Sequence, residues 1–130
     1  MTDYASAKQA YTSSSVMTAP PQKLVVMLYD GALRSSAAAY DAMARRDIPA
    51  RRVALSKTMS IIGELQNTLD MKAGGAIAEE LDRLYNWMTA ELLHAAVRQD
   101  PTPIRNVARV LETLRDGWQQ VAVKAPESAA

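Results

Sequence analysis

The chain has 130 residues, about the size of one ordinary domain, and 48% of them are hydrophobic while 22% are charged. Its formal net charge of +1 comes from 15 basic and 14 acidic residues along the whole chain, which argues against nucleic acid as a partner, because phosphate binding needs clustered Lys and Arg. The absence of cysteine excludes disulfides and thiolate metal sites. No apolar run approaches the ~20 residues of a membrane span, and the first residues carry no secretion signal. We therefore expect a cytoplasmic protein without membrane insertion.

Residues 1–19 are rich in Ser, Thr and Ala, and we expect them to form a mobile N-terminal arm or a short extra helix. Tyr11 and Val16 are among the larger side chains of this arm, and they have no local core of their own. Either the arm folds back onto the rest of the chain or these side chains wait for a partner. Folding back is the favoured prediction, because exposed apolar surface tends to be covered.

Two long helices are predicted next, at 21–46 and 49–69. Pro21 suits a first helical position, where its missing N–H would have no partner. Asp47 lies in the break between the helices and can cap the second one. The second helix has one apolar stripe at helical spacing, with two further apolar positions beside it. The stripe is Leu55, Met59, Ile62 and Leu69, and the additional positions are Ile61 and Leu65.

Two more amphipathic helices follow, at 76–99 and 103–124. The paired glycines Gly74-Gly75 separate the first of them from the preceding helix. Apolar residues alternate at spacings of three and four in both segments, as expected of a helix with one buried face. In the last helix the stripe is Ile104, Val107, Leu111, Leu114, Trp118 and Val121, and Val110 lies beside it.

Four amphipathic helices with short connections predict an all-α protein, an antiparallel up-down four-helix bundle. The bundle would occupy residues 20–124, preceded by the flexible arm or cap at 1–19. Residues 125–130 are predicted to be a disordered tail. We find no internal repeat and no apolar pattern long enough for a lone coiled coil.

No residue pattern predicts an enzyme. Glu91 and His94 have the Glu-x-x-His spacing of bundle proteins that bind two metal ions. Such a site needs two of these motifs and further carboxylates, and His94 is the only histidine of the chain. The serines do not form a nucleophile elbow, and there is no glycine-rich phosphate loop. We expect no catalytic residue, no metal and no cofactor.

Several blocks of the sequence resemble the FliS-type flagellar export chaperones, at family-like spacing and over almost the whole chain. The most specific block is Met27-Leu28-Tyr29-Asp30-Gly31-Ala32, which follows Pro20-Pro21 and Lys23-Leu24-Val25-Val26. The others include Ile61-Ile62-Gly63-Glu64-Leu65, Gly74-Gly75-Ala76-Ile77-Ala78, Leu84-Tyr85-Asn86-Trp87-Met88 and Leu114-Arg115-Asp116-Gly117-Trp118.

This resemblance implies a cytosolic helical bundle that binds the disordered C-terminal segment of flagellin. It implies that the protein keeps flagellin from polymerising early and helps to deliver it to an export-gate component of the flagellar type III secretion apparatus. It also implies that the N-terminal arm covers a client-binding groove when no client is bound.

The residues themselves suggest where such a client would bind. A bundle with apolar faces wider than its core requires offers grooves for amphipathic helices. We expect the surplus positions Ile61, Leu65, Val107 and Val110 to form these grooves, and Tyr11 and Val16 to act as a lid. The alternative function is a self-associating helical regulatory or interaction module without a flagellin client, and a weak homodimer is compatible with both.

Overall fold

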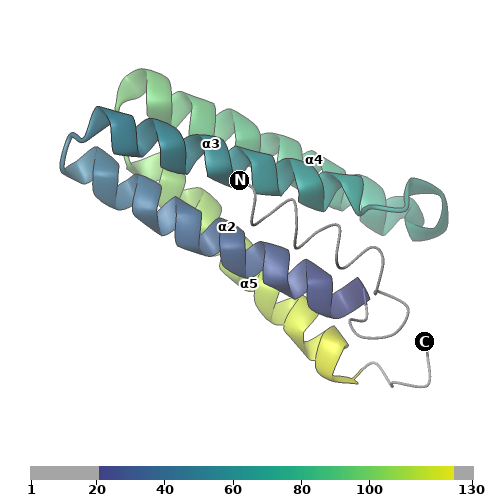
Figure 1. The fold of residues 1–130 in the computed structure, drawn as a ribbon. Helices are drawn as coiled ribbons and strands as arrows, with labels where there is room; N and C mark the ends of the chain where they lie inside the picture. Colours follow the sequence, from purple (N-terminus) through teal and green to yellow (C-terminus); the bar gives the residue numbers. More distant parts are fainter. Residues whose placement is uncertain (1–20, 125–130) are drawn as a thin grey trace.

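The computed structural model describes residues 21–124, and over this range the chain forms four α-helices and no β-strand. Successive helices run in opposite directions and are joined by short connections (Figure 1), which gives an antiparallel up-and-down bundle. The predicted all-α four-helix architecture is therefore confirmed. The predicted arm at 1–19 and the predicted tail at 125–130 lie outside the described residues. The helices are α2 Pro21–Ala44, α3 Ile48–Asn67, α4 Met71–Arg98 and α5 Thr102–Lys124.

Aspartates satisfy free backbone N–H groups at the starts of α3, α4 and α5. Asp47 accepts a hydrogen bond from the N–H of Ala50 at 3.1 Å, which confirms its predicted capping role. Asp70 accepts one from Ala73 at 2.9 Å, and Asp100 accepts one from the first residue of α5 at 3.0 Å. Each carboxylate also places negative charge near the positive end of a helix dipole, so the three turns are defined by local sequence.

The start of α4 differs from the prediction, because a short helical segment precedes the expected one. The helix begins at Met71 rather than Ala76, and a kink at Gly75 divides it. Gly75 has φ +54°, a conformation that side chains disfavour, and a Cβ at Gly74 would lie only 2.7 Å from the Cβ of Ala78. The paired glycines therefore break the helix as predicted, while the cap by Asp70 allows another helical turn before them.

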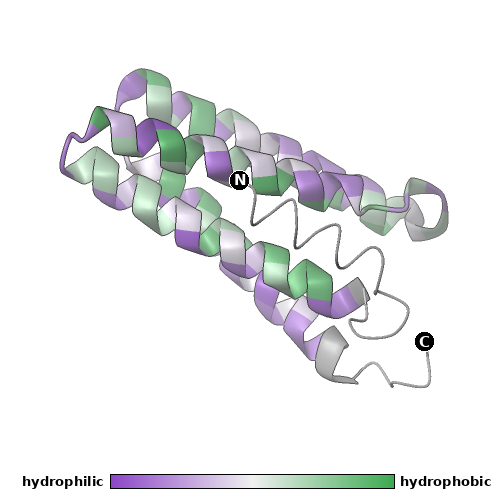
Figure 2. Ribbon diagram, in the orientation of Figure 1, coloured by the Kyte–Doolittle hydropathy of each residue, from purple (hydrophilic) through white to green (hydrophobic). Residues whose placement is uncertain are grey.

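Each helix packs against two neighbours: α2 and α4 each contact both α3 and α5, with α2 making the more extensive contacts. Apolar and polar residues alternate along each helix in Figure 2, as expected when one face is buried. No helix of the described range is long and apolar enough to cross a membrane. The largest apolar side chains of the core are Tyr29, Tyr85, Ile62, Leu65, Met88, Leu92, Ile104, Leu111 and Val107.

Candidate functional site

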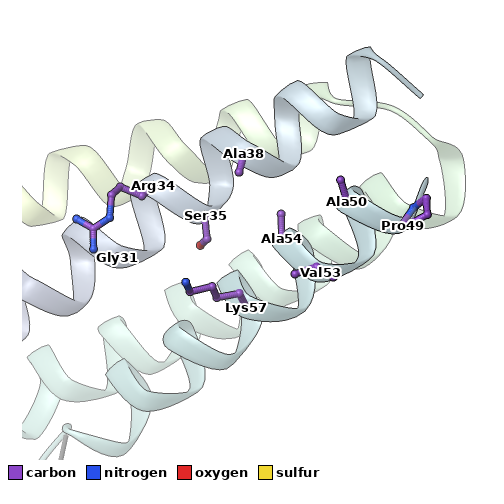
Figure 3. A pocket seen from close by; sticks show the side chains of 9 residues that line it. All are labelled: Gly31, Arg34, Ser35, Ala38, Pro49, Ala50, Val53, Ala54 and Lys57. Carbon is purple, nitrogen blue, oxygen red and sulfur yellow. The ribbon is translucent and has the colours of Figure 1, made fainter. Parts of the chain in front are cut away.

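An apolar groove lies on the outside of the bundle, along the line where α2 and α3 meet (Figure 3). Its volume is about 560 Å³. Arg34 and Lys57 lie at one end, and Pro49 and Ala50 lie at the other. We call it the α2–α3 groove, and its lining residues are Gly31, Arg34, Ser35, Ala38, Pro49, Ala50, Val53, Ala54 and Lys57.

The groove is hollow because its lining side chains are small. Ala38 on α2 and Ala50 on α3 are too short to fill the space above the helix contact. A Cβ at Gly31 would lie 3.4 Å from Cδ1 of Ile61, so α2 approaches the core side chain closely at this point. Val53 is the large aliphatic residue of the lining, and it is 70% exposed. The groove therefore combines solvent-accessible apolar surface with space for a further side chain or helix.

The floor of the groove is polar but already hydrogen-bonded. Ser35 donates to the carbonyl oxygen of Ala32 at 3.1 Å. The hydroxyl of Thr58 lies 2.7 Å from the Ser35 hydroxyl oxygen and 2.8 Å from the carbonyl oxygen of Ala54. Ser35 and Thr58 are both buried, so this network satisfies their hydroxyls and ties α2 to α3. The buried hydroxyls therefore have little capacity left to hydrogen-bond to a bound partner.

The charged residues of the lining are both cations. Arg34 on α2 and Lys57 on α3 are exposed, and neither has a hydrogen-bond or ion-pair partner within residues 21–124. The lining contains no acidic residue. One end of the groove therefore carries positive charge that the described part of the chain does not neutralise.

The structure places the predicted binding residues differently from the expectation. Ile61, Leu65 and Val107 are 3%, 0% and 0% exposed and belong to the core, so the prediction that they are surplus surface is wrong. Val110 is half-buried and packs against that core. The physical reason is that α3 and α5 each pack against two neighbours, which bury these three positions. Tyr11 and Val16 lie outside the described residues.

Sequence reasoning missed the groove because it sought large apolar residues on wide stripes. The signal was present in another form. Gly31 and Ala38 are seven residues apart on α2, and Ala50, Val53 and Lys57 follow at spacings of three and four on α3. Such spacings place each set on one helix face, away from the predicted core stripe of α3. Small residues on two adjacent faces indicate a shallow channel rather than a filled core.

Below the surface, two buried tyrosine hydroxyls link α2 to α4. The hydroxyls of Tyr29 on α2 and Tyr85 on α4 hydrogen-bond to each other, and both side chains are buried. Trp118 on α5 packs against the same core and is a polar neighbour of Tyr29. Burial raises the pKa of both tyrosines above the usual value, and the neighbouring Tyr85 adds to the rise for Tyr29. The pair therefore stays neutral in the folded protein at ordinary pH.

Polar contacts at the rim connect neighbouring helices of the bundle. Arg115 on α5 pairs with Asp30 on α2, with 2.8 Å between Nε and Oδ1. This pair, mainly through its hydrogen bond, raises the pKa of Arg115. On the other side of the bundle, Gln66 of α3 donates to Asp82 of α4 at 3.0 Å. Each contact links one of the helices that line the groove to a neighbour outside it.

The metal-site candidate from the sequence, Glu91 and His94, is not joined by further ligands among the described residues. Nδ1 of His94 lies 4.0 Å from Oε1 of Glu91, and the side chain of His94 is 60% exposed. Within residues 21–124, no group of three or more His, Asp or Glu side chains is arranged to hold a metal ion. The α2–α3 groove, unlike this pair, has the geometry of a binding site.

Comparison with known proteins gives a consistent family. A sequence model of the family described as flagellar protein FliS matches residues 4–125. The flagellar secretion chaperone FliS of Salmonella typhimurium is 37% identical over 118 residues, which cover 90% of this chain and 87% of that protein. FliS of Campylobacter jejuni is 36% identical and FliSB of Pseudomonas aeruginosa 34%, each with 88% of this chain covered and 90% and 91% of the respective relative. The resemblance found in the sequence is confirmed: the chain belongs to the FliS family.

Proposed function

We propose that this protein is a cytoplasmic flagellar secretion chaperone that binds the disordered C-terminal segment of flagellin. In this role it prevents premature polymerisation and assists delivery to an export-gate component of the flagellar type III apparatus. The observation that carries the proposal is the sequence relationship to proteins named flagellar secretion chaperones, which extends over about 90% of the chain. A chaperone of this kind needs a binding surface and no catalytic group.

The surface of the bundle supports this role. Filament subunits polymerise when amphipathic terminal helices find one another, so covering one such helix removes the driving force. An apolar groove between two helices can bury the apolar face of such a helix, because a third amphipathic helix can pack along it. The α2–α3 groove has the required exposed aliphatic surface at Val53 and the space above Ala38 and Ala50.

The binding residues predicted from the sequence have different roles in this proposal. Val110 is half-buried and is the described member of the set that a client could contact directly. Ile61, Leu65 and Val107 would support the binding surfaces from the core. Tyr11 and Val16 keep their proposed role in a lid that a client displaces.

Isothermal titration calorimetry with the C-terminal segment of flagellin from the same organism tests the proposal. We expect saturable binding with a negative heat-capacity change, because apolar surface is buried. The N-terminal segment of the same flagellin is the control. Filament growth followed by light scattering should stop when equimolar protein is added. Absence of heat with the C-terminal segment, together with unimpeded filament growth, would contradict the proposed function.

A deletion tests the lid. Removal of residues 1–15 should increase binding of a hydrophobic dye and change the affinity for the flagellin segment. Dye binding at the level of the full-length chain would remove the lid from the proposal. Helix content by circular dichroism provides the control, because a misfolded variant would also bind dye.

Self-association is the second candidate function, and the outer face of α4 favours it. Trp87, Leu93 and Val97 are 39%, 49% and 82% exposed. With Ala90 between them, they follow at steps of three, three and four residues and form a continuous exposed ridge. Sedimentation at increasing concentration tests this candidate. A monomer at all concentrations, unchanged by Val97→Lys, would exclude a dimer through this ridge.

A further inference from the structure

We propose that the α2–α3 groove binds an amphipathic helix whose one end carries carboxylates, and that Arg34 and Lys57 pair with these carboxylates and fix the direction of the bound helix. The inference deepens the proposed function and rests on it, since the helix would belong to the client's C-terminal segment. It adds a location, an orientation and a charge requirement to that function.

The shape of the groove favours a helix over an extended strand. Gly31 and Ala38 are seven residues apart on α2, which corresponds to roughly 10 Å at 1.5 Å per residue, or about two turns of a helix. An extended segment would bring unpaired backbone N–H and C=O groups against an apolar lining. The floor cannot satisfy them, because the Ser35 and Thr58 hydroxyls already bond to each other and to backbone. A helix satisfies its own backbone internally.

The small lining residues define the face that such a helix presents. Helices approach closely where the side chains between them are short. Gly31, Ala38 and Ala50 provide short side chains on both walls, while Val53 provides an aliphatic contact. A face of alanine, leucine or valine at spacings of three and four fits this surface.

The two cations determine the direction in which the bound helix lies in the groove. Arg34 and Lys57 reach the same end of the groove from opposite helices (Figure 3). Neither has an acidic partner among residues 21–124. A carboxylate placed between them would bond to both cations, beside an apolar surface that lowers the competition from water. At the opposite end the lining residues Pro49 and Ala50 are uncharged, and the cations that follow them on α3, Arg51 and Arg52, are not part of the lining. A helix inserted in the reverse direction would lose these pairs.

The test is a charge reversal with two probes. The variants are Arg34→Glu, Lys57→Glu and the double variant, and the controls are Arg109→Glu and Lys72→Glu at exposed cations outside the groove. The first probe is the C-terminal segment of flagellin. The second is a designed helical peptide with alanine and leucine on one face and two glutamates at one end. A copy with lysines in place of the glutamates is the matched control peptide.

For the wild-type chain we expect binding of the acidic designed helix, weakened by added salt, and little binding of the lysine copy. The double variant should bind both the acidic helix and the flagellin segment about tenfold more weakly, since two exposed pairs are lost and replaced by repulsion. It should bind the lysine copy more tightly. The control variants should behave as wild type. Unchanged thermal unfolding of the double variant verifies that the fold is intact.

Each outcome decides the inference. Unchanged affinity of the double variant for both probes overturns it, as does failure of the wild type to bind the acidic designed helix. If the wild type binds the acidic helix in a manner that depends on Arg34 and Lys57 but ignores the flagellin segment, the groove is confirmed and the proposed function fails. If flagellin binds equally well to wild type and double variant, the function stands and the groove is not its site.

Discussion

The two sides of the contact between α2 and α3 carry very different apolar surfaces. On the inner side, Ile61, Leu65 and Tyr29 are large and buried to within a few per cent of completeness. On the outer side, Gly31, Ala38 and Ala50 are small, and Val53 is mostly exposed. The inner side holds the bundle together, whereas the outer side leaves space that residues 21–124 do not fill. In this helix pair, large side chains on the inner side stabilise the fold, and small side chains on the outer side leave a surface for binding.

The largest effect is expected from placing a carboxylate on the inner side. Leu65→Asp buries a charge without a partner, which costs more than the roughly 2–5 kcal/mol of truncating such a leucine to alanine. The variant should lose cooperative unfolding in circular dichroism. Val53→Asp makes the same kind of change on the outer side of the same helix. It should alter the free energy of unfolding by less than about 0.5 kcal/mol and weaken client binding.

An intact, cooperatively folded Leu65→Asp protein would contradict the core assignment of this residue. If both variants unfold equally, the two sides do not differ as described. Val53→Ala serves as the mild control, because it removes methyl groups at an exposed position without adding charge.

Alkaline pH should destabilise the inner side of the contact, where Tyr29 is buried. Burial raises the pKa of Tyr29 and Tyr85 above the unfolded value of about 10, so the fold favours their protonated forms. Their contribution to stability is fully present below about pH 10 and is lost as the pH rises above it. Absorbance of tyrosinate should show that these tyrosines ionise only as the helices unfold.

The variant Tyr29→Phe provides the control for this titration. It should reduce the number of tyrosines that ionise with unfolding and make the unfolding midpoint less sensitive to alkali. Ionisation of all tyrosines near pH 10 with helix content unchanged would show that the hydroxyl pair is accessible to water.

Filling the outer side should affect binding but not folding. In Ala38→Trp the indole would occupy the groove, and we expect about tenfold weaker binding of the flagellin segment, equivalent to about 1.4 kcal/mol. Ala37→Trp is the matched control, because Ala37 is the exposed neighbour outside the lining. Equal affinity of the two variants in calorimetry would show that the client does not enter the groove. Thermal unfolding of both should be close to wild type.

The smallest effect is expected at the rim. Arg115 and Asp30 form an ion pair whose side chains are 32% and 36% exposed, so Arg115→Gln should cost about 0.2–1 kcal/mol. Arg83→Gln, at a pair more exposed to solvent within α4, should cost less. Urea unfolding of Arg115→Gln, Asp30→Asn and the double variant would give the coupling energy. A coupling above about 2 kcal/mol would mean that the pair belongs to the core rather than its rim.

The sequence predicted the architecture well because local signals agreed with the global fold. Asp47 and Gly75 defined turns through caps and backbone conformation, and spacings of three and four defined the helices. The start of α4 was misplaced because Asp70 adds a helical turn that the glycine pair obscured.

The binding surface was harder to predict. Periodicity identifies an apolar face but not how many neighbours cover it, so Ile61, Leu65 and Val107 were taken as spare when two adjacent helices bury them. A groove forms where two adjacent helices lack large side chains between them. Its small residues, Ala38 and Ala50 among them, look unremarkable until the helices are placed side by side.

Mapping the client onto the protein tests the central claim most directly. Backbone amide shifts of the isotopically labelled full-length chain should be recorded by nuclear magnetic resonance as the flagellin C-terminal segment is added. The account predicts that shifts concentrate on α2 and α3 around Gly31, Ala38 and Val53, with Arg34 and Lys57 responding most to salt. Shifts confined to α4 and α5, with the α2–α3 groove unchanged at saturation, would contradict it.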